Sequence, residues 1–164
     1  FGTQVAEVEV DTYTGEVQVL GIWAVHDVGR AINPRGVEGQ IEGGVVQGLG
    51  QALMEEYETV GGHTTTHGFA KYILPTSLDI PQINCTLIED KDPLSPLGAK
   101  GIGEPSLVPT APAIMNAIYD AIGVRMKSLP ATPEKILSAL KNKTPGRENY
   151  VLAAREQRAQ AHRN

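Results

Sequence analysis

Residues 98–105 have the sequence Gly-Ala-Lys-Gly-Ile-Gly-Glu-Pro, and the rest of the chain is expected to be organised around this stretch. Its glycines permit positive φ angles and a close approach of the backbone to a bound group. Pro105 disfavours a helical conformation at the preceding residue, so we expect Glu104 at the end of an irregular loop before an apolar helix. There the carboxylate has the position of a general base. The alternative is an acidic residue at a helix entrance, stabilised by the helix dipole.

Composition limits the class of protein. The chain has 164 residues, enough for one domain, and 41% of them are hydrophobic, which is compatible with a packed core. The net charge of −5 argues against a general nucleic-acid binder. The lone Cys85 can form no internal disulfide and cannot ligate an iron–sulfur cluster by itself. Since no run is long enough to span a bilayer, we expect a cytoplasmic protein with neither nucleic-acid nor membrane partners.

The first 30 residues are predicted to form a hairpin. Ala6, Val8 and Val10 alternate with acidic residues, as in a half-buried strand. A second strand is predicted with one face made of Val17, Val19, Gly21, Trp23 and Val25. Residues 26–30, His-Asp-Val-Gly-Arg, are interpreted as a polar loop in which Asp27 pairs with Arg30 or caps a turn; a catalytic role is the alternative.

A long glycine-rich helix is predicted from residue 34 to about residue 58, after the Asn33-Pro34 start signal. Its core face is expected to comprise Val37, Ile41, Val45, Gly48, Ala52 and Leu53. Gln40, Gln47 and Gln51 form another stripe, which is either solvated or in contact with a ligand. Each helical glycine costs about 1 kcal/mol relative to alanine, so the glycines indicate close approach of another backbone or a cofactor.

The remaining pattern predicts short elements. Residues 61–68 are interpreted as a loop or short hairpin, and its two histidines have no third metal ligand nearby. Residues 83–88 alternate as a strand. One helix is predicted from Thr110 to a C-terminal cap at Gly123, and a short last helix is predicted after an N-cap at Thr132.

These elements together predict an α+β fold. We expect two layers, a mainly antiparallel sheet with helices packed on one face. Residues 1–143 are assigned to this domain, and residues 144–164 to a polar tail or docking helix.

Two motifs resemble those of molybdenum hydroxylases, the xanthine dehydrogenase and aldehyde oxidase family. Residues 98–123 are similar to the last active-site segment of the family's large subunit. Residues 37–50, Val-Glu-Gly-Gln-Ile-Glu-Gly-Gly-Val-Val-Gln-Gly-Leu-Gly, resemble its Gly-Gln-x-Glu-Gly run. The resemblance covers roughly residues 1–143 and only the carboxy-terminal part of that subunit. The chain is therefore expected to be a fragment of a larger molybdenum-cofactor-binding domain, or a separately made piece of it.

The resemblance implies a role for individual residues. Glu104 corresponds to the catalytic base. Gln40 corresponds to a contact with the molybdenum–pterin cofactor, either molybdopterin or its cytosine dinucleotide. Gly39, Lys100, Gly101 and Gly103 are the other expected cofactor-binding positions. No side chain of this chain is expected to ligate the metal.

The resemblance also implies a reaction and partners. The reaction is oxidative hydroxylation of an N-heterocycle (xanthine-like) or an aldehyde, with water as the oxygen source. Iron–sulfur clusters and FAD are expected only on partner subunits or domains, and the rest of the molybdenum-binding subunit, a small-molecule substrate and an oligomeric assembly are expected as well. Two alternatives stay open: a non-catalytic assembly domain or fragment that is inactive alone, and an unrelated α+β binding module.

Overall fold

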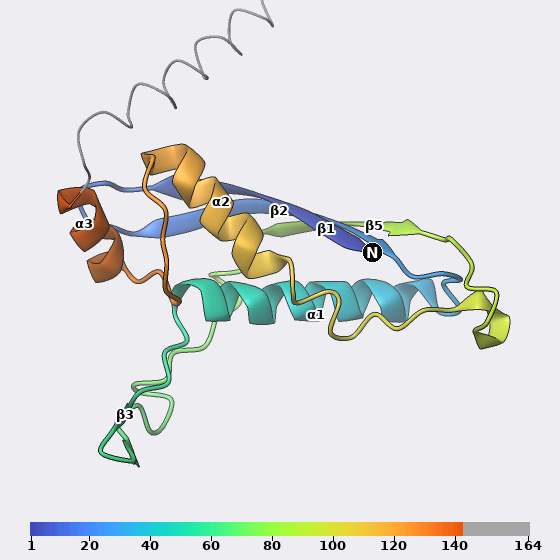
Figure 1. The fold of residues 1–164 in the computed structure, drawn as a ribbon, viewed down its shortest axis with the longest axis horizontal. Coiled ribbons are helices and arrows are strands. Elements are labelled where there is room, and N and C mark those ends of the chain that lie inside the picture. Colours follow the sequence, from blue (N-terminus) through green and yellow to red (C-terminus); the bar gives the residue numbers. More distant parts are fainter. Residues whose placement is uncertain (143–164) are drawn as a thin grey trace, which may run out of the picture.

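A three-stranded sheet and three helices make up the body of the molecule in the computed structural model, which describes residues 1–142 (Figure 1). The strand order is β1 (Gly2–Val10), β2 (Val17–Asp27) and β5 (Gln82–Ile88). The helices are α1 (Pro34–Leu53), α2 (Thr110–Ile122) and α3 (Pro133–Lys141). The tail or docking helix predicted at 144–164 lies outside the described residues.

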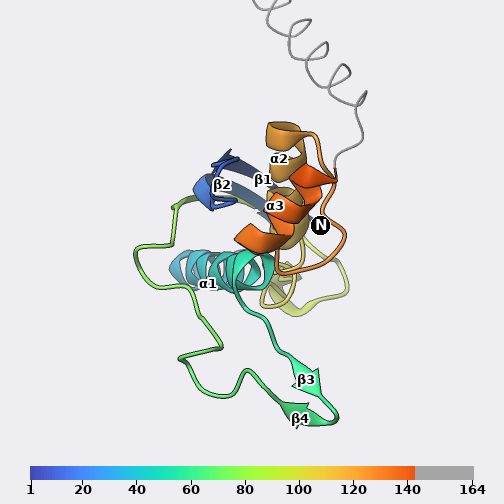
Figure 2. The ribbon, with the colours of Figure 1, turned by 90° about the vertical axis from the view of Figure 1, so that its left-hand side faces the viewer.

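The two-layer α+β arrangement is confirmed. β1 and β2 form the predicted antiparallel hairpin, whereas β5 pairs with β2 in parallel. A parallel neighbour needs a crossover connection rather than a tight turn, and here α1 and the segment after it provide that connection. Within residues 1–142, the helices pack on one face of the sheet, and no helix lies on the opposite face (Figure 2).

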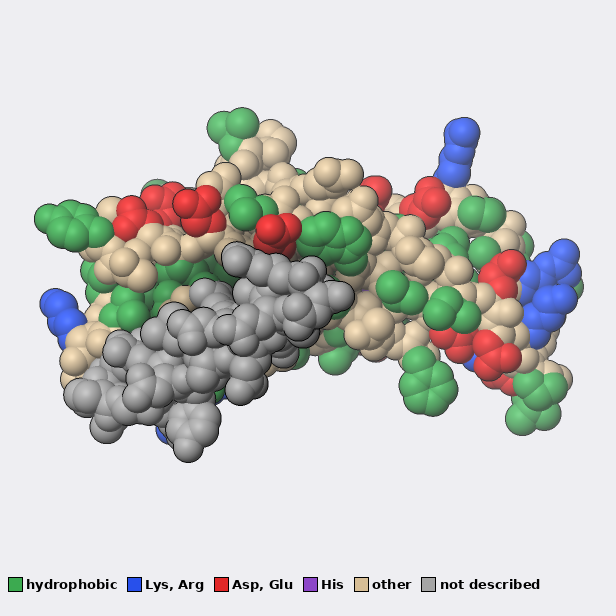
Figure 3. All heavy atoms as spheres, turned by 90° about the horizontal axis from the view of Figure 1, so that it is seen from above, with side chains coloured by type: hydrophobic (Ala, Val, Ile, Leu, Met, Phe, Trp, Pro, Cys, Tyr) green, Lys and Arg blue, Asp and Glu red, His purple; other side chains and the backbone are tan. Residues whose placement is uncertain are grey.

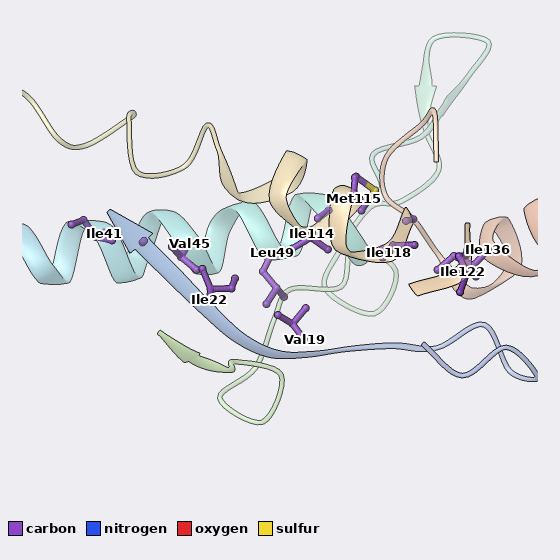
Figure 4. Packing of buried hydrophobic residues seen from close by; sticks show 13 residues of the cluster. Val19, Ile22, Ile41, Val45, Leu49, Ile114, Met115, Ile118, Ile122 and Ile136 are labelled. Carbon is purple, nitrogen blue, oxygen red and sulfur yellow. The ribbon is translucent and has the colours of Figure 1, made fainter. Parts of the chain in front are cut away.

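The core lies between that sheet face and the helices (Figure 4). Ile22 of β2, Leu49 of α1 and Ile118 of α2 are almost completely buried there, and Ile136 of α3 closes one end. Side chains from four separate segments thus share one apolar cluster. Because burying a large aliphatic side chain stabilises a fold by about 1.5–3 kcal/mol, this cluster fixes how α1 and α2 lie on the sheet.

A β-bulge changes which face of β2 is buried. The alternation predicts Val19 and Trp23 on one face, and this is wrong for the second half of the strand. The pairing with β1 shifts opposite Val8, and Leu20 is an extra residue without a partner. Beyond it Ile22 points into the core, while Trp23 is 43% exposed on the outer face. An extra residue inverts the alternation because side chains change face at every residue.

The helix α1 begins as predicted and ends earlier. The side chain of Asn33 accepts a hydrogen bond from the Gly36 amide at 3.1 Å, which caps the first turn. The helix stops at Leu53, not near residue 58. The amides of Met54 and Glu55 both donate to the carbonyl of Gly50, at 3.0 and 2.8 Å. This closes the last turn and turns the chain away from the helix axis.

A projecting arm follows α1. It carries the two-stranded hairpin β3 (Thr59–Val60) and β4 (His63–Thr64), as expected for residues 61–68. Figure 2 shows the hairpin lying well away from the sheet and helices. Its turn uses Gly61 and Gly62, whose φ angles are +57° and +83°.

Among the described residues, no helix is long and apolar enough to cross a membrane.

The later helices follow their sequence signals. Gly123 ends α2 in the left-handed conformation with φ +69°, as a glycine C-cap does. The side chain of Thr132 accepts a hydrogen bond from the Lys135 amide and caps α3. Both predicted ends are confirmed.

The glycines of α1 fall into two groups. A Cβ atom on Gly48 would lie 2.5 Å from Cβ of Thr110, and one on Gly44 would lie 2.8 Å from Cβ of Ser106. These two positions are small because the start of α2 and the turn before it pack directly on α1. A Cβ atom on Gly39 or Gly43 would meet no atom within 4 Å. Packing against α2 and the turn before it therefore explains Gly44 and Gly48, whereas nothing within the described chain explains Gly39 and Gly43.

Candidate functional site

The segment 98–100 is anchored to the end of β2 by main-chain hydrogen bonds. The Lys100 amide donates to the Val28 carbonyl at 2.9 Å, and the Arg30 amide donates to the Gly98 carbonyl at 2.9 Å. Gly98 has φ +74°, so the predicted need for a glycine conformation is confirmed there. Gly101 and Gly103 have no positive φ. A Cβ atom on Gly101 would meet no atom within 4 Å and one on Gly103 would make only an ordinary contact, so neither conformation nor packing within the described chain requires a glycine there.

Glu104 lies in a tight turn just before α2. Its carbonyl accepts the Leu107 amide at 3.0 Å, and the helix starts at Thr110. The side chain of Glu104 is exposed. The predicted position, an irregular loop that leads into an apolar helix, is confirmed.

The structure brings the Gln40 helix and the Glu104 turn together. The hydroxyl of Ser106 lies 2.7 Å from the Gly103 carbonyl oxygen and 3.1 Å from the Gln40 carbonyl oxygen. A Cβ atom on Gly103 would lie 3.8 Å from Oε1 of Gln40. Two motifs more than 60 residues apart in the sequence therefore form one surface.

A shallow depression of about 230 Å³ lies beside this surface. Gln40 and Lys100 are among the residues that line it, together with Val28 and Ile102. Gly39 and Gly101 are exposed, and a Cβ atom on Gly101 would meet no atom within 4 Å. Of the predicted site residues, the depression is thus lined by Gln40 and Lys100, and not by Glu104, Gly39, Gly101 or Gly103.

Lys100 is paired within the chain. Its ammonium lies 2.5 Å from Oδ2 of Asp27 and 3.6 Å from Oδ2 of Asp90. Asp27 also accepts the Gly29 amide at 3.0 Å, so its predicted turn-capping role is confirmed. Its ion-pair partner is Lys100, however, and not the predicted Arg30, because the backbone pairing of segments 28–30 and 98–100 sets the lysine beside it. The role of Lys100 toward an anionic cofactor stays a prediction.

The Asp27–Lys100 pair makes stability sensitive to acid. The hydrogen bond from Lys100, with that from the Gly29 amide, lowers the pKa of Asp27 from 3.8 to about 2. A lowered carboxyl pKa stabilises the fold above the unfolded value and loses this effect as pH falls through the folded value. The thermal midpoint of Asp27→Asn should therefore lie below wild type from pH 7 to about 4, and the difference should shrink between about pH 4 and 2. Asp90→Asn is the control, since the Asp90 carboxylate is 81% exposed; a pH-independent difference for Asp27→Asn would contradict the assignment.

A buried polar network underlies the Glu104 turn, and the sequence analysis missed it. Gln4, His26, Ser106 and Thr110 are the buried polar residues of the described chain. The amide nitrogen of Gln4 donates to the Ser106 carbonyl at 2.7 Å and lies 3.3 Å from Nε2 of His26. The Thr110 hydroxyl donates to Oε1 of Gln4 at 2.7 Å. The available signal was the strand period, which puts Gln4 on the same inward face as three apolar residues of β1.

His26 belongs to β2 and is fully buried, so its assignment to a polar loop is wrong. The strand continues through His26 because this residue pairs with Gly2 of β1 and Leu87 of β5, and the bulge turns its side chain toward the helices. The Gln4 atom facing Nε2 must be a nitrogen, since the same atom bonds a carbonyl. Nε2 therefore accepts, and the ring proton lies on Nδ1, which has no partner. Burial lowers the pKa of His26, which favours the neutral ring.

His63 and His67 are the two histidines of the projecting arm. His63 lies in β4, and Nδ1 of His67 is 3.3 Å from the Thr64 carbonyl oxygen. Over residues 1–142, no three His, Cys, Asp or Glu side chains gather in a way that could hold a metal ion.

Comparisons with known proteins point to one family. A family model described as a molybdopterin cofactor-binding domain matches residues 1–81. Subunit gamma of the 6-hydroxypseudooxynicotine dehydrogenase complex of Paenarthrobacter nicotinovorans is 43% identical over 143 residues, covering 84% of this chain and 18% of that protein. The aldehyde oxidoreductase molybdenum-binding subunit PaoC of Escherichia coli is 39% identical, covering 85% of this chain and 20% of that subunit.

A solved structure gives the same result for the fold. Quinoline 2-oxidoreductase from Pseudomonas putida 86 superposes with a TM-score of 0.80 at 38% identity, covering 84% of this chain and 18% of that one. The chain thus spans about a fifth of the length of these relatives. Sequence and fold agree across most of the described residues, and the chain belongs to the molybdenum-binding subunits of the xanthine dehydrogenase and aldehyde oxidoreductase family.

Proposed function

We propose that this chain forms one wall of a molybdenum hydroxylase site, which oxidatively hydroxylates an aldehyde or a xanthine-like N-heterocycle with water as the oxygen source. The observation that carries the proposal is the junction between the Gln40 helix and the Glu104 turn. Ser106 bonds both segments, and the side chain of Gln40 lies beside Gly103. A candidate cofactor contact and a candidate base are thereby held on one surface.

The residues present fit a molybdenum–pterin cofactor. The Gln40 amide offers both a donor and an acceptor, as the polar edge of a pterin requires. A Cβ atom on Gly39, Gly43 or Gly101 would meet no atom within 4 Å, so these positions leave open space at the surface of the described chain. We assign Gln40, Gly39, Gly101 and Gly103 to cofactor contact. Lys100 is placed at the rim, where its ion pair with Asp27 orients the loop backbone.

The proposed contribution of this chain to the chemistry is proton transfer and positioning. When bound, the cofactor supplies the two-electron redox chemistry. Glu104 accepts a proton at its carboxylate from the water whose oxygen enters the product. The turn around it has a fixed shape, since the Leu107 amide bonds its carbonyl. Gln40 orients the cofactor, and the anchored segment 98–100 fixes the start of the loop.

The exposed apolar face of the sheet supports a proposal about partners. Val5 and Trp23 pair across the strands on the uncovered face of the sheet and are 61% and 43% exposed. Figure 3 shows hydrophobic side chains at the surface seen from above Figure 1. We assign this face to contact with the remainder of the molybdenum-binding subunit. Iron–sulfur clusters and FAD on partner subunits or domains are proposed to remove the electrons.

The test of this function is the cofactor content of the complete enzyme with and without Gln40. Gln40→Ala should lower molybdenum and pterin occupancy or slow reduction of the metal by substrate, because an orienting amide is lost. The fold should be unaffected, since only the main-chain carbonyl of Gln40 bonds Ser106. Metal analysis and single-turnover reduction measure both effects.

Gln51→Ala is the matched control. Gln51 is an exposed glutamine on the same helix, about 16 Å along the axis from Gln40 at 1.5 Å per residue. It should leave occupancy and reduction unchanged. If Gln40→Ala behaves like Gln51→Ala, Gln40 belongs to a solvated face. If the complete wild-type enzyme contains neither molybdenum nor pterin, the proposed function is wrong.

A further inference from the structure

The buried polar network lies directly beneath the Glu104 turn. Its members come from β1, β2, the turn and α2, and they are bonded into one chain of contacts. We propose that Ser106 and Gln4 are positioning residues for Glu104, holding the turn at a fixed place relative to the Gln40 helix. The proposal rests on the proposed function, because it names the supports of the same base.

Ser106 is the direct support. Its hydroxyl reaches the carbonyls of Gly103 and Gln40, so it joins the residue before Glu104 to the helix that carries Gln40. The side chain is fully buried. Gly44 leaves the space that it occupies, because a Cβ atom there would overlap the hydroxyl. Without the hydroxyl, the carbonyls of Gly103 and Gln40 lose the donor that they share, and the side-chain link between the turn and α1 is lost.

Gln4 supports Ser106 from the sheet. Its amide nitrogen donates to the Ser106 carbonyl at 2.7 Å, and its Oε1 accepts from Thr110 at the start of α2. All the polar atoms of its amide therefore have partners that define its orientation. Ser106 is held through its side chain to α1 and through its main chain to β1. This pair of supports fixes the turn against rotation as well as translation.

The network acts on Glu104 through the backbone, and no member touches its carboxylate. Glu104 itself is exposed and lies between Gly103 and Pro105, so its place depends on the turn. A base misplaced by about 1 Å can lower turnover about 10²-fold. A residue that only stabilised the fold would lower the amount of folded enzyme and not the rate per molybdenum.

A double-mutant cycle in the complete enzyme tests the proposal. Ser106→Ala should lower kcat per molybdenum by about 10-fold or more, with KM little changed. In the Glu104→Gln background, the same change should lower the residual single-turnover rate by less than about twofold, since the base on which it acts is gone. Equal losses in both backgrounds, or no loss in either, would overturn the proposal. A Glu104→Gln enzyme with near-normal turnover would instead overturn the assignment of Glu104 as the base, on which the proposal rests.

A second variant and a control make the result specific. Gln4→Met keeps the side-chain length, removes the bonds to Ser106 and Thr110, and should show the same non-additive pattern. Thr65→Val removes a hydroxyl that lies 3.3 Å from a main-chain carbonyl in the arm, and should change neither kcat nor KM. If both Ser106→Ala and Gln4→Met lack molybdenum, the network serves the fold alone and the proposal is wrong.

Discussion

Replacing Glu104 by glutamine is expected to lower turnover of the complete enzyme by about 10²–10⁴-fold, the range for loss of a general base. Glutamine has nearly the same shape, but its amide cannot accept the proton. The contacts that shape the turn use the Glu104 carbonyl and remain in the variant. Molybdenum and pterin content should therefore be unchanged. Steady-state rates with an aldehyde and with an N-heterocycle, normalised to molybdenum, measure the effect.

The control for this substitution is Glu16→Gln. Glu16 is an exposed glutamate in the turn between β1 and β2, outside the candidate site. Its loss changes the net charge by the same amount and should leave turnover unchanged. A Glu104→Gln enzyme that turns over like Glu16→Gln would show that Glu104 is a helix-entry acid and not a base.

The second large effect is expected at Gly44. In Gly44→Ala the new methyl would overlap the Ser106 hydroxyl and lie 3.0 Å from the Leu107 amide nitrogen. The neighbouring atoms are partly backbone, so α1 and the turn must separate. Overpacking of this kind destabilises a core by about 1–3 kcal/mol. Thermal unfolding should show a lower midpoint, and turnover should fall because the separated segments carry Gln40 and Glu104.

Gly43→Ala provides the comparison within the same helical turn. A Cβ atom at Gly43 meets nothing within 4 Å of the described chain. Alanine favours a helix interior by up to about 1 kcal/mol over glycine, so the thermal midpoint should rise or stay the same. Equal destabilisation by both substitutions would mean that helix propensity, and not contact with Ser106, explains Gly44.

Local signals predicted the parts of the fold that depend on local chemistry. Asn33, Gly123 and Thr132 end or begin helices as expected, because a cap satisfies backbone groups within a few residues of itself. The roles of Gln40 and Glu104 came from resemblance to a family. No pattern in the sequence shows that the Gln40 helix and the Glu104 turn lie side by side, since the link between them is made by Ser106 across the packed interface.

Tertiary pairing explains what the sequence analysis missed. Lys100 and Asp27 are 73 residues apart, and only the pairing of two backbone segments makes them partners. His26 was predicted to lie in a loop because Asp27, Gly29 and Arg30 follow it and are typical of a polar turn. Its burial follows from the extra residue at Leu20, which shifts the pairing of two strands and leaves no signature in either strand alone.

The extra residue at Leu20 has a consequence for insertions and deletions. Before it the inward positions of β2 are odd-numbered, and after it they are even-numbered. Deleting any one residue between Val19 and Ile22 would turn Ile22, Ala24 and His26 outward together and would turn Trp23 and Val25 toward the core. Replacing Leu20 by another residue would leave that phase intact. For this strand, the number of residues is therefore a stricter constraint than the identity of the side chain at position 20.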